Sequence, residues 1–139
     1  MSGTQTFTMI KPEAVAKGLT GAIIKKIQDS DFTIKALKMH QLSKDQAKVF
    51  YDVHEGKPFY DGLTTYMSSG PLVAIILEKS NAVVDFRALV GSTDPNEAAE
   101  GTLRKEFAES KTQNAVHGSD SDENALIESN FHFAGIEQF

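Results

Sequence analysis

Residues 71–79, PLVAIILEK, restrict the possible fold more than any other segment of this chain. The uninterrupted apolar run from Leu72 to Leu77 is much too short to span a bilayer, which takes about 20 helical residues. A short apolar run that follows a proline and ends at polar residues has the length of a buried strand. We therefore expect residues 71–79 to form a central strand of a sheet covered by helices.

Three further segments are predicted to be strands, at 6–11 (TFTMIK), 32–42 (FTIKALKMHQL) and 131–133 (FHF). Helices are expected within 17–31, 43–54, 56–70, 81–91 and 101–111, and a last helix after NAVHGSD at 114–120. The helix caps suggested by side-chain type are Thr20, Ser43 and either Ser119 or Asp120. The element order predicts an α/β fold of the α+β sandwich type, with a ferredoxin-like four-stranded antiparallel sheet covered by helices. Its 139 residues suit a single domain spanning 1–139.

Composition narrows the class of protein further. The absence of cysteine excludes disulfides, thiolate chemistry and cysteine-ligated zinc. The N-terminus has neither a basic start nor a long apolar stretch, which favours a cytoplasmic location without a membrane partner. A net charge of −5 argues against specific nucleic-acid binding, which depends on a dense basic surface.

Both arginines of the chain, Arg87 and Arg104, lie in residues 71–139, which also carry twelve acidic residues. Two arginines in an acidic half are either solvated surface groups or the ligands of an anion. The sequence alone leaves both interpretations open.

Common catalytic motifs are absent: the chain has no G-x-x-x-x-G-K-[ST] or G-x-G-x-x-G phosphate loop and no G-x-S-x-G elbow. Its four histidines lie far apart without metal-ligand spacing, so no protein-built metal site is expected. His117, within NAVHGSD, is therefore the main candidate for chemistry, with Asn114 and Ser119 beside it and Glu128 as the next acid able to orient the ring. A buried structural histidine remains the alternative on the residues alone.

Five segments, in order and over nearly the whole chain, resemble the nucleoside diphosphate kinase family. They are IKPEAV (10–15), GLTGAII (18–24), FYDGLTTYMSSGP (59–71), GSTDPNEAAEGTLRKEF (91–107) and NAVHGSDSDENALIE (114–128). The resemblance implies a ping-pong reaction, in which a nucleoside triphosphate, mainly ATP, phosphorylates the enzyme and a nucleoside diphosphate takes the phosphate back. It also implies Mg²⁺ carried by the nucleotide phosphates, and a homo-oligomer, tetramer or hexamer, built from dimers.

The resemblance assigns a role to twelve positions. His117 corresponds to the phosphorylated histidine, oriented by Ser119 and Glu128. The substrate-binding positions are Lys11 and Asn114 for sugar and phosphates, Arg87, Arg104 and Thr93 for phosphates, and Phe59 for base stacking. Supporting positions are Leu63 as a second wall for the base, and Tyr51 and His54 near the phosphates. The chain departs from the family pattern at Lys111 and Glu100.

Two other functions stay open at the level of sequence. A nucleotide-binding scaffold could retain the fold without the chemistry, and a phosphorelay protein could pass phosphate from His117 to a partner's aspartate. The nucleotide preference also stays open.

Overall fold

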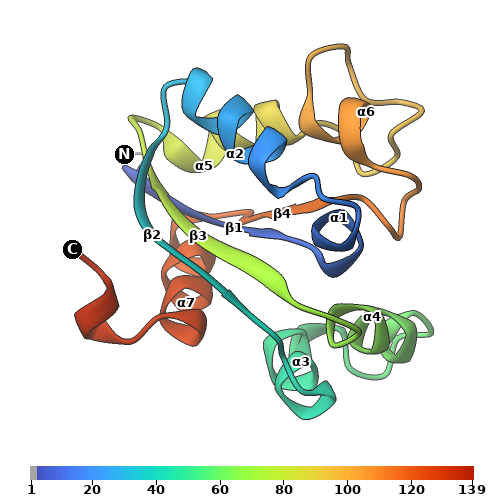
Figure 1. The fold of residues 1–139 in the computed structure, drawn as a ribbon. Coiled ribbons are helices and arrows are strands. Elements are labelled where there is room, and N and C mark those ends of the chain that lie inside the picture. The colour runs from blue at the N-terminus through green and yellow to red at the C-terminus, as the bar shows by residue number, and fades with distance from the viewer. Residues whose placement is uncertain (1–2) are drawn as a thin grey trace.

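Four antiparallel strands in the order β2-β3-β1-β4 form the centre of the computed structural model, which describes residues 3–139 (Figure 1). The strands are β1 (Gln5–Ile10), β2 (Thr33–His40), β3 (Leu72–Glu78) and β4 (Val116–Gly118). The expected ferredoxin-like sheet with helices on both faces is confirmed.

Helices cover the two faces of this sheet in separate groups (Figure 1). On one face lie α2 (Thr20–Asp29), α5 (Ala82–Val90) and α6 (Leu103–Phe107). On the other face lie α3 (Lys44–Phe50), α4 (Tyr60–Met67) and α7 (Asp122–His132). The short elements are α1 (Pro12–Ala16) after β1, η1 (Asp52–His54) between α3 and α4, and η2 (Gly135–Glu137) after α7. Within residues 3–139, no helix has the length and apolar character needed to cross a bilayer.

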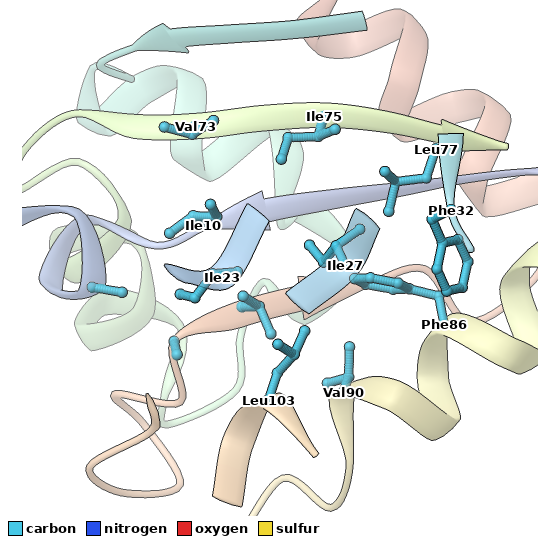
Figure 2. Close-up of a cluster of buried hydrophobic side chains, with 13 residues drawn as sticks. Ile10, Ile23, Ile27, Phe32, Val73, Ile75, Leu77, Phe86, Val90 and Leu103 are labelled. Carbon is cyan, nitrogen blue, oxygen red and sulfur yellow. The ribbon is translucent and has the colours of Figure 1, made fainter. Parts of the chain in front are cut away.

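The apolar run of β3 is buried because it serves two cores. Val73, Ile75 and Leu77 belong to the cluster beneath α2, α5 and α6, which Figure 2 shows in close-up. Leu72 and Ala74 belong to the cluster on the opposite face. Successive side chains of a strand point to opposite faces, so a strand between two cores is apolar at every position.

The prediction of a strand at 131–133 is wrong. Helix α7 continues to His132, and Phe133 packs into the second core. The fourth strand is β4, in which His117 pairs with Met9 of β1. The pattern of three residues is too short to distinguish a helix from a strand. Residues 116–118 form a strand because they pair with β1.

Helix starts differ from expectation at three places. Pro12 begins an unexpected helix, α1, as its first residue, where its missing N–H costs nothing. Thr20 is inside α2 rather than its cap, and Ser121, not Ser119 or Asp120, caps α7. Ser43 caps α3 as predicted, with its side chain accepting from the Gln46 amide.

Gly91 ends α5 in a conformation that other residues avoid, and replacing it will destabilise the fold. Its φ is +87°, and a Cβ there would lie 2.7 Å from the Cβ of Thr102. We expect Gly91→Ala to lower the free energy of unfolding by about 2–4 kcal/mol, from backbone strain and overpacking together. Urea unfolding followed by circular dichroism measures this.

Gly101→Ala is the matched control, because Gly101 has the same φ of +87° but open space around its Cβ position. This variant introduces the backbone strain without the clash with a neighbouring side chain, and we expect it to lower the free energy of unfolding by about 1–2 kcal/mol. Equal losses in the two variants would contradict the packing argument.

Candidate active site

One nitrogen of the His117 imidazole is held by a carboxylate. His117 Nε2 lies 2.9 Å from Oε1 of Glu128 on α7, and the Ser119 hydroxyl donates to the same oxygen at 2.5 Å. Because a carboxylate accepts hydrogen bonds, this contact places the ring proton on Nε2 and leaves the lone pair on Nδ1. The three residues thus meet as the sequence predicted, and they leave an unprotonated ring nitrogen in a fixed orientation.

Aromatic rings pack behind His117 and restrict its movement. The centroids of Phe7 on β1 and Phe50 on α3 each lie 6.0 Å from that of the half-buried imidazole. The ring is therefore confined by packing as well as by its hydrogen bond.

A cleft of about 380 Å³ opens beside His117 and carries two arginines and a threonine. Its lining comprises Arg87, Val90, Gly91, Ser92, Thr93, Arg104, His117 and Gly118. Arg87 is exposed on the last turn of α5. Within residues 3–139 neither arginine forms an ion pair with a carboxylate. Two guanidinium groups without carboxylate partners suit a multiply charged anion such as a phosphate chain.

Arg104 also forms hydrogen bonds with three backbone carbonyls around the cleft. Its guanidinium donates to the carbonyls of Val116 at 2.9 Å, Asn114 at 3.3 Å and Gly91 at 3.4 Å. Burial, and then the charge of Arg87, lowers the pKa of Arg104 to about 10, so it stays charged at neutral pH.

A second, larger cleft of about 790 Å³ shares Arg87, His117 and Gly118 with the first and extends to Tyr51 and His54. The Tyr51 hydroxyl and His54 Nδ1 are buried without a hydrogen-bond partner among residues 3–139. Burial, and then the charge of Glu128, raises the pKa of Tyr51, so its O–H remains a donor. Two of the predicted supporting residues, Tyr51 and His54, thus carry polar atoms without a partner and line the same cleft as the histidine.

Lys11 and Asn114 form a buried polar pair next to these clefts. Lys11 Nζ donates to Asn114 Oδ1 at 2.7 Å, and Asn114 Nδ2 donates to the carbonyl of Lys111 at 2.9 Å. Neither Lys11 nor Asn114 lines either cleft, but Arg104 contacts the Asn114 carbonyl from the first. Burial, and then Arg104, lowers the pKa of Lys11 to about 7, while Glu13 opposes the shift.

Phe59 and Leu63 line neither cleft. Phe59 immediately precedes α4 and is 51% exposed, with its ring centroid 5.1 Å from that of His54. Leu63, one turn on, packs partly buried against the second core. An exposed aromatic face next to a residue of the larger cleft is available for stacking.

Comparisons with known proteins agree with this geometry. The family model described as "Nucleoside diphosphate kinase" matches residues 4–137. The chain is 56% identical to the nucleoside diphosphate kinase of Flavobacterium psychrophilum over 139 residues, which is all of both chains. It is 54% identical to that of Chlorobium luteolum over 133 residues, 96% of this chain and 95% of the relative. The chain belongs to the nucleoside diphosphate kinase family.

Solved structures of nucleoside diphosphate kinases share its fold. The enzyme of Aquifex aeolicus superposes with a TM-score of 0.95 at 40% identity, covering 98% of this chain and 99% of that one. The Halobacterium salinarum enzyme, solved in complex with CDP, superposes with a TM-score of 0.92 at 33% identity, covering 97% and 90%. The predicted enzyme class, a phosphotransferase with nucleoside diphosphate kinase activity, is confirmed by these matches.

The kinase does not build a metal cage of its own in the described residues. No group of three or more histidine, aspartate or glutamate side chains in residues 3–139 is arranged to hold a metal ion. Two arginines and the hydroxyls of Ser92 and Thr93 line the smaller cleft. Guanidinium and hydroxyl groups donate hydrogen bonds to phosphate oxygens and are not typical metal ligands, so this lining suits a phosphate chain.

Glu13 and Tyr66 belong to the surroundings of the site but were missed in the sequence. The Glu13 carboxylate accepts from the Ala115 amide at 3.0 Å and from the Tyr66 hydroxyl at 3.1 Å. The only sequence signal was an acid directly after Pro12. Its target lies 102 residues away, which no local pattern reveals.

Proposed function

We propose that this kinase transfers the γ-phosphate of a nucleoside triphosphate, mainly ATP, to a nucleoside diphosphate through a phosphohistidine on His117. The observation that carries the proposal is the contact between Glu128 and His117 Nε2, which leaves Nδ1 as the nucleophile beside two arginines. In the first half-reaction Nδ1 attacks the γ-phosphorus, and the P–O bond to the departing diphosphate breaks. In the second half-reaction a terminal oxygen of another diphosphate attacks, and the N–P bond breaks.

The cations beside His117 stabilise the phosphoryl group as it moves. Arg87 and Arg104 offset the charge on its equatorial oxygens, and the Thr93 hydroxyl donates to the same phosphates. Tyr51 and His54 supply further donors from the larger cleft, whose unpartnered polar atoms support this role. Mg²⁺ bound to the phosphates neutralises further negative charge, and in this proposal no protein cage holds it.

The nucleoside is held farther from His117. Lys11 and Asn114 contact the ribose and the phosphates, and Phe59 stacks on the base with Leu63 as a second wall. Stacking tolerates every base because each has a π-face, so we expect broad nucleotide use. Ser119 and Glu128 keep the imidazole oriented.

We further propose that the kinase is a cytoplasmic homo-oligomer, a tetramer or a hexamer that is built from dimers. Its partners are nucleoside tri- and diphosphates rather than a membrane or a specific nucleic acid. Residues 1–139 act as one domain. Light scattering after size-exclusion chromatography measures the assembly.

Labelled nucleotide tests the proposed reaction. Incubation with γ-labelled ATP and Mg²⁺ should label the protein with acid-labile, base-stable phosphate, and added GDP should remove the label as GTP. A protein that takes no label would be a binding scaffold. A label that only a protein acceptor removes would indicate a phosphorelay, and either result contradicts the proposal.

Nucleotide binding should take up protons above neutral pH, because of Lys11. With its pKa near 7, the Lys11 amine is mostly neutral near pH 8 in the free enzyme. Phosphate charges favour the ammonium form and raise this pKa, so binding adds a proton near pH 8 and much less near pH 6. Calorimetry of ADP binding in buffers of different ionisation enthalpy measures the uptake.

Lys11→Gln is the control for this prediction, because it removes the titrating amine. The extra proton uptake near pH 8 should disappear in the variant, leaving only that of the nucleotide itself. Identical uptake by the variant and the unmodified enzyme would contradict the role of Lys11.

A further inference from the structure

The turn at residues 114–116 depends on contacts that come from the first turn of α1. Ala115 has a φ of +71°, an unfavourable conformation for a residue with a Cβ, and the Val116 amide donates to the Asn114 carbonyl at 2.8 Å. This turn sets the direction of Asn114 and leads directly into β4, which carries His117. Its support therefore affects both substrate contact and nucleophile.

Lys11 and Glu13 hold opposite ends of Ala115. The Lys11 amide donates to the Ala115 carbonyl at 2.8 Å, and the Ala115 amide donates to Glu13 Oε1 at 3.0 Å. The Tyr66 hydroxyl on α4 donates to the same carboxylate oxygen at 3.1 Å. With both its N–H and its C=O engaged by one neighbouring segment, the strained residue is held in place.

Glu13 is also a countercharge for a buried cation. Its side chain is only 10% exposed, and Lys11 is 6% exposed. The other charged or titratable groups near this pair are Arg104 from α6, Tyr66 from α4, Glu109 beyond α6, and Lys17 directly after α1, whose Nζ lies 3.6 Å from Glu13 Oε2. Arg104 disfavours the ammonium form of Lys11, and Glu13 favours it. A buried charge is costly unless an opposite charge lies near it.

We propose that Glu13 is a positioning residue of this kinase, whose carboxylate fixes the 114–116 turn and favours the charged, substrate-binding form of the Lys11 amine. The inference rests on the proposed function, in which Lys11 and Asn114 contact the nucleotide. Glu13 itself touches neither phosphate nor sugar in this proposal and acts through these two residues.

Glu13→Gln tests the charge, since the amide oxygen can still accept from Ala115 and Tyr66. Losing the negative charge lowers the pKa of Lys11, so the alkaline limb of kcat/KM for the nucleoside diphosphate should move to lower pH. We expect kcat/KM near pH 8 to fall about tenfold, the effect of one pKa unit, with a much smaller loss near pH 6. An unchanged profile, or an equal loss at every pH, would overturn the proposal.

Two companion variants separate charge from hydrogen bonding. Tyr66→Phe removes one hydrogen bond to Glu13 but keeps the charge, so its alkaline limb should not move. Glu13→Asp also keeps the charge but draws the carboxylate back from Ala115, so kcat should fall about three- to tenfold with the limb in place. A shifted limb in either variant, or full activity of Glu13→Asp, would overturn the proposal even if Glu13→Gln does not fold.

Labelling by γ-labelled ATP distinguishes the two proposals. Absence of label on the unmodified protein defeats the phosphohistidine mechanism, and this inference with it. Labelled protein combined with an unshifted Glu13→Gln profile defeats only the role of Glu13.

Discussion

His117→Gln should abolish the phosphoenzyme and lower kcat by a factor of about 10⁴ or more, the scale of losing a catalytic nucleophile. Glutamine has no nucleophilic nitrogen, because its amide lone pair is delocalised into the carbonyl. It occupies a similar volume between Phe7 and Phe50, so the cleft and the arginines should stay in place. Nucleotide affinity should therefore persist while transfer is lost. Alkali-quenched labelling with γ-labelled ATP measures the phosphoenzyme, coupled kinetics measure transfer, and calorimetry of ADP binding measures the nucleotide affinity.

His40→Gln is the control for nonspecific loss of a histidine. His40 lies on β2, where its Nε2 contacts His132 Nδ1 at 2.8 Å, and it lines neither of the clefts at His117. This variant should take the label as the unmodified protein does. Acid-labile phosphate that persists on His117→Gln would assign the chemistry to another residue.

Arg104→Gln should lower the rate of both half-reactions by about 10³, at the lower end of what a catalytic arginine contributes to phosphoryl transfer. The side chain supplies a charge at the cleft and also holds three backbone carbonyls around it. Glutamine removes the charge and most of these donors, so the melting temperature should also fall. Rapid-quench measurement of phosphoenzyme formation, and of its decay on adding diphosphate, separates the two half-reactions.

We expect that the loss of positive charge alone does not explain the lower rate of Arg104→Gln, and two further variants test this. Lys105→Gln removes a neighbouring positive charge on α6 outside the clefts, and its rates should be unchanged. Arg104→Lys keeps the charge but loses the planar fork, so it should recover only part of the rate. An Arg104→Gln enzyme within a few-fold of full activity would contradict a role for Arg104 at the phosphates.

The longer helices and strands could be predicted from the pattern of their own residues. The run at 71–79 was predicted as a central strand, and β3 lies between the two cores for the reason its composition indicated. Residues 43–54 and 81–91 were predicted to contain helices. Helix α3 starts with the side-chain cap of Ser43, as predicted, and α5 ends at Gly91, which has a positive φ. The short elements were not predicted. Helix α1 has five residues and β4 has three, and β4 forms by pairing with β1.

The candidate site residues could also be proposed from the sequence, because the motifs that contain them are short and continuous in the chain. NAVHGSD indicated a histidine with polar neighbours, and Glu128 does meet the ring. Glu13 was not found, because its function lies in a contact with Ala115 rather than in its own pattern.

The sequence by itself therefore determined the fold class, most of the helices and strands, and a set of candidate site residues. The tertiary structure decided which of them meet: the ring nitrogen that Glu128 holds, the clefts that Arg87 shares with His117, and the burial of Lys11 beside Asn114. The physical reason is that helix and strand propensities act over a few neighbouring residues. Burial, hydrogen-bond partners and pKa values depend on groups that approach only when the sheet closes.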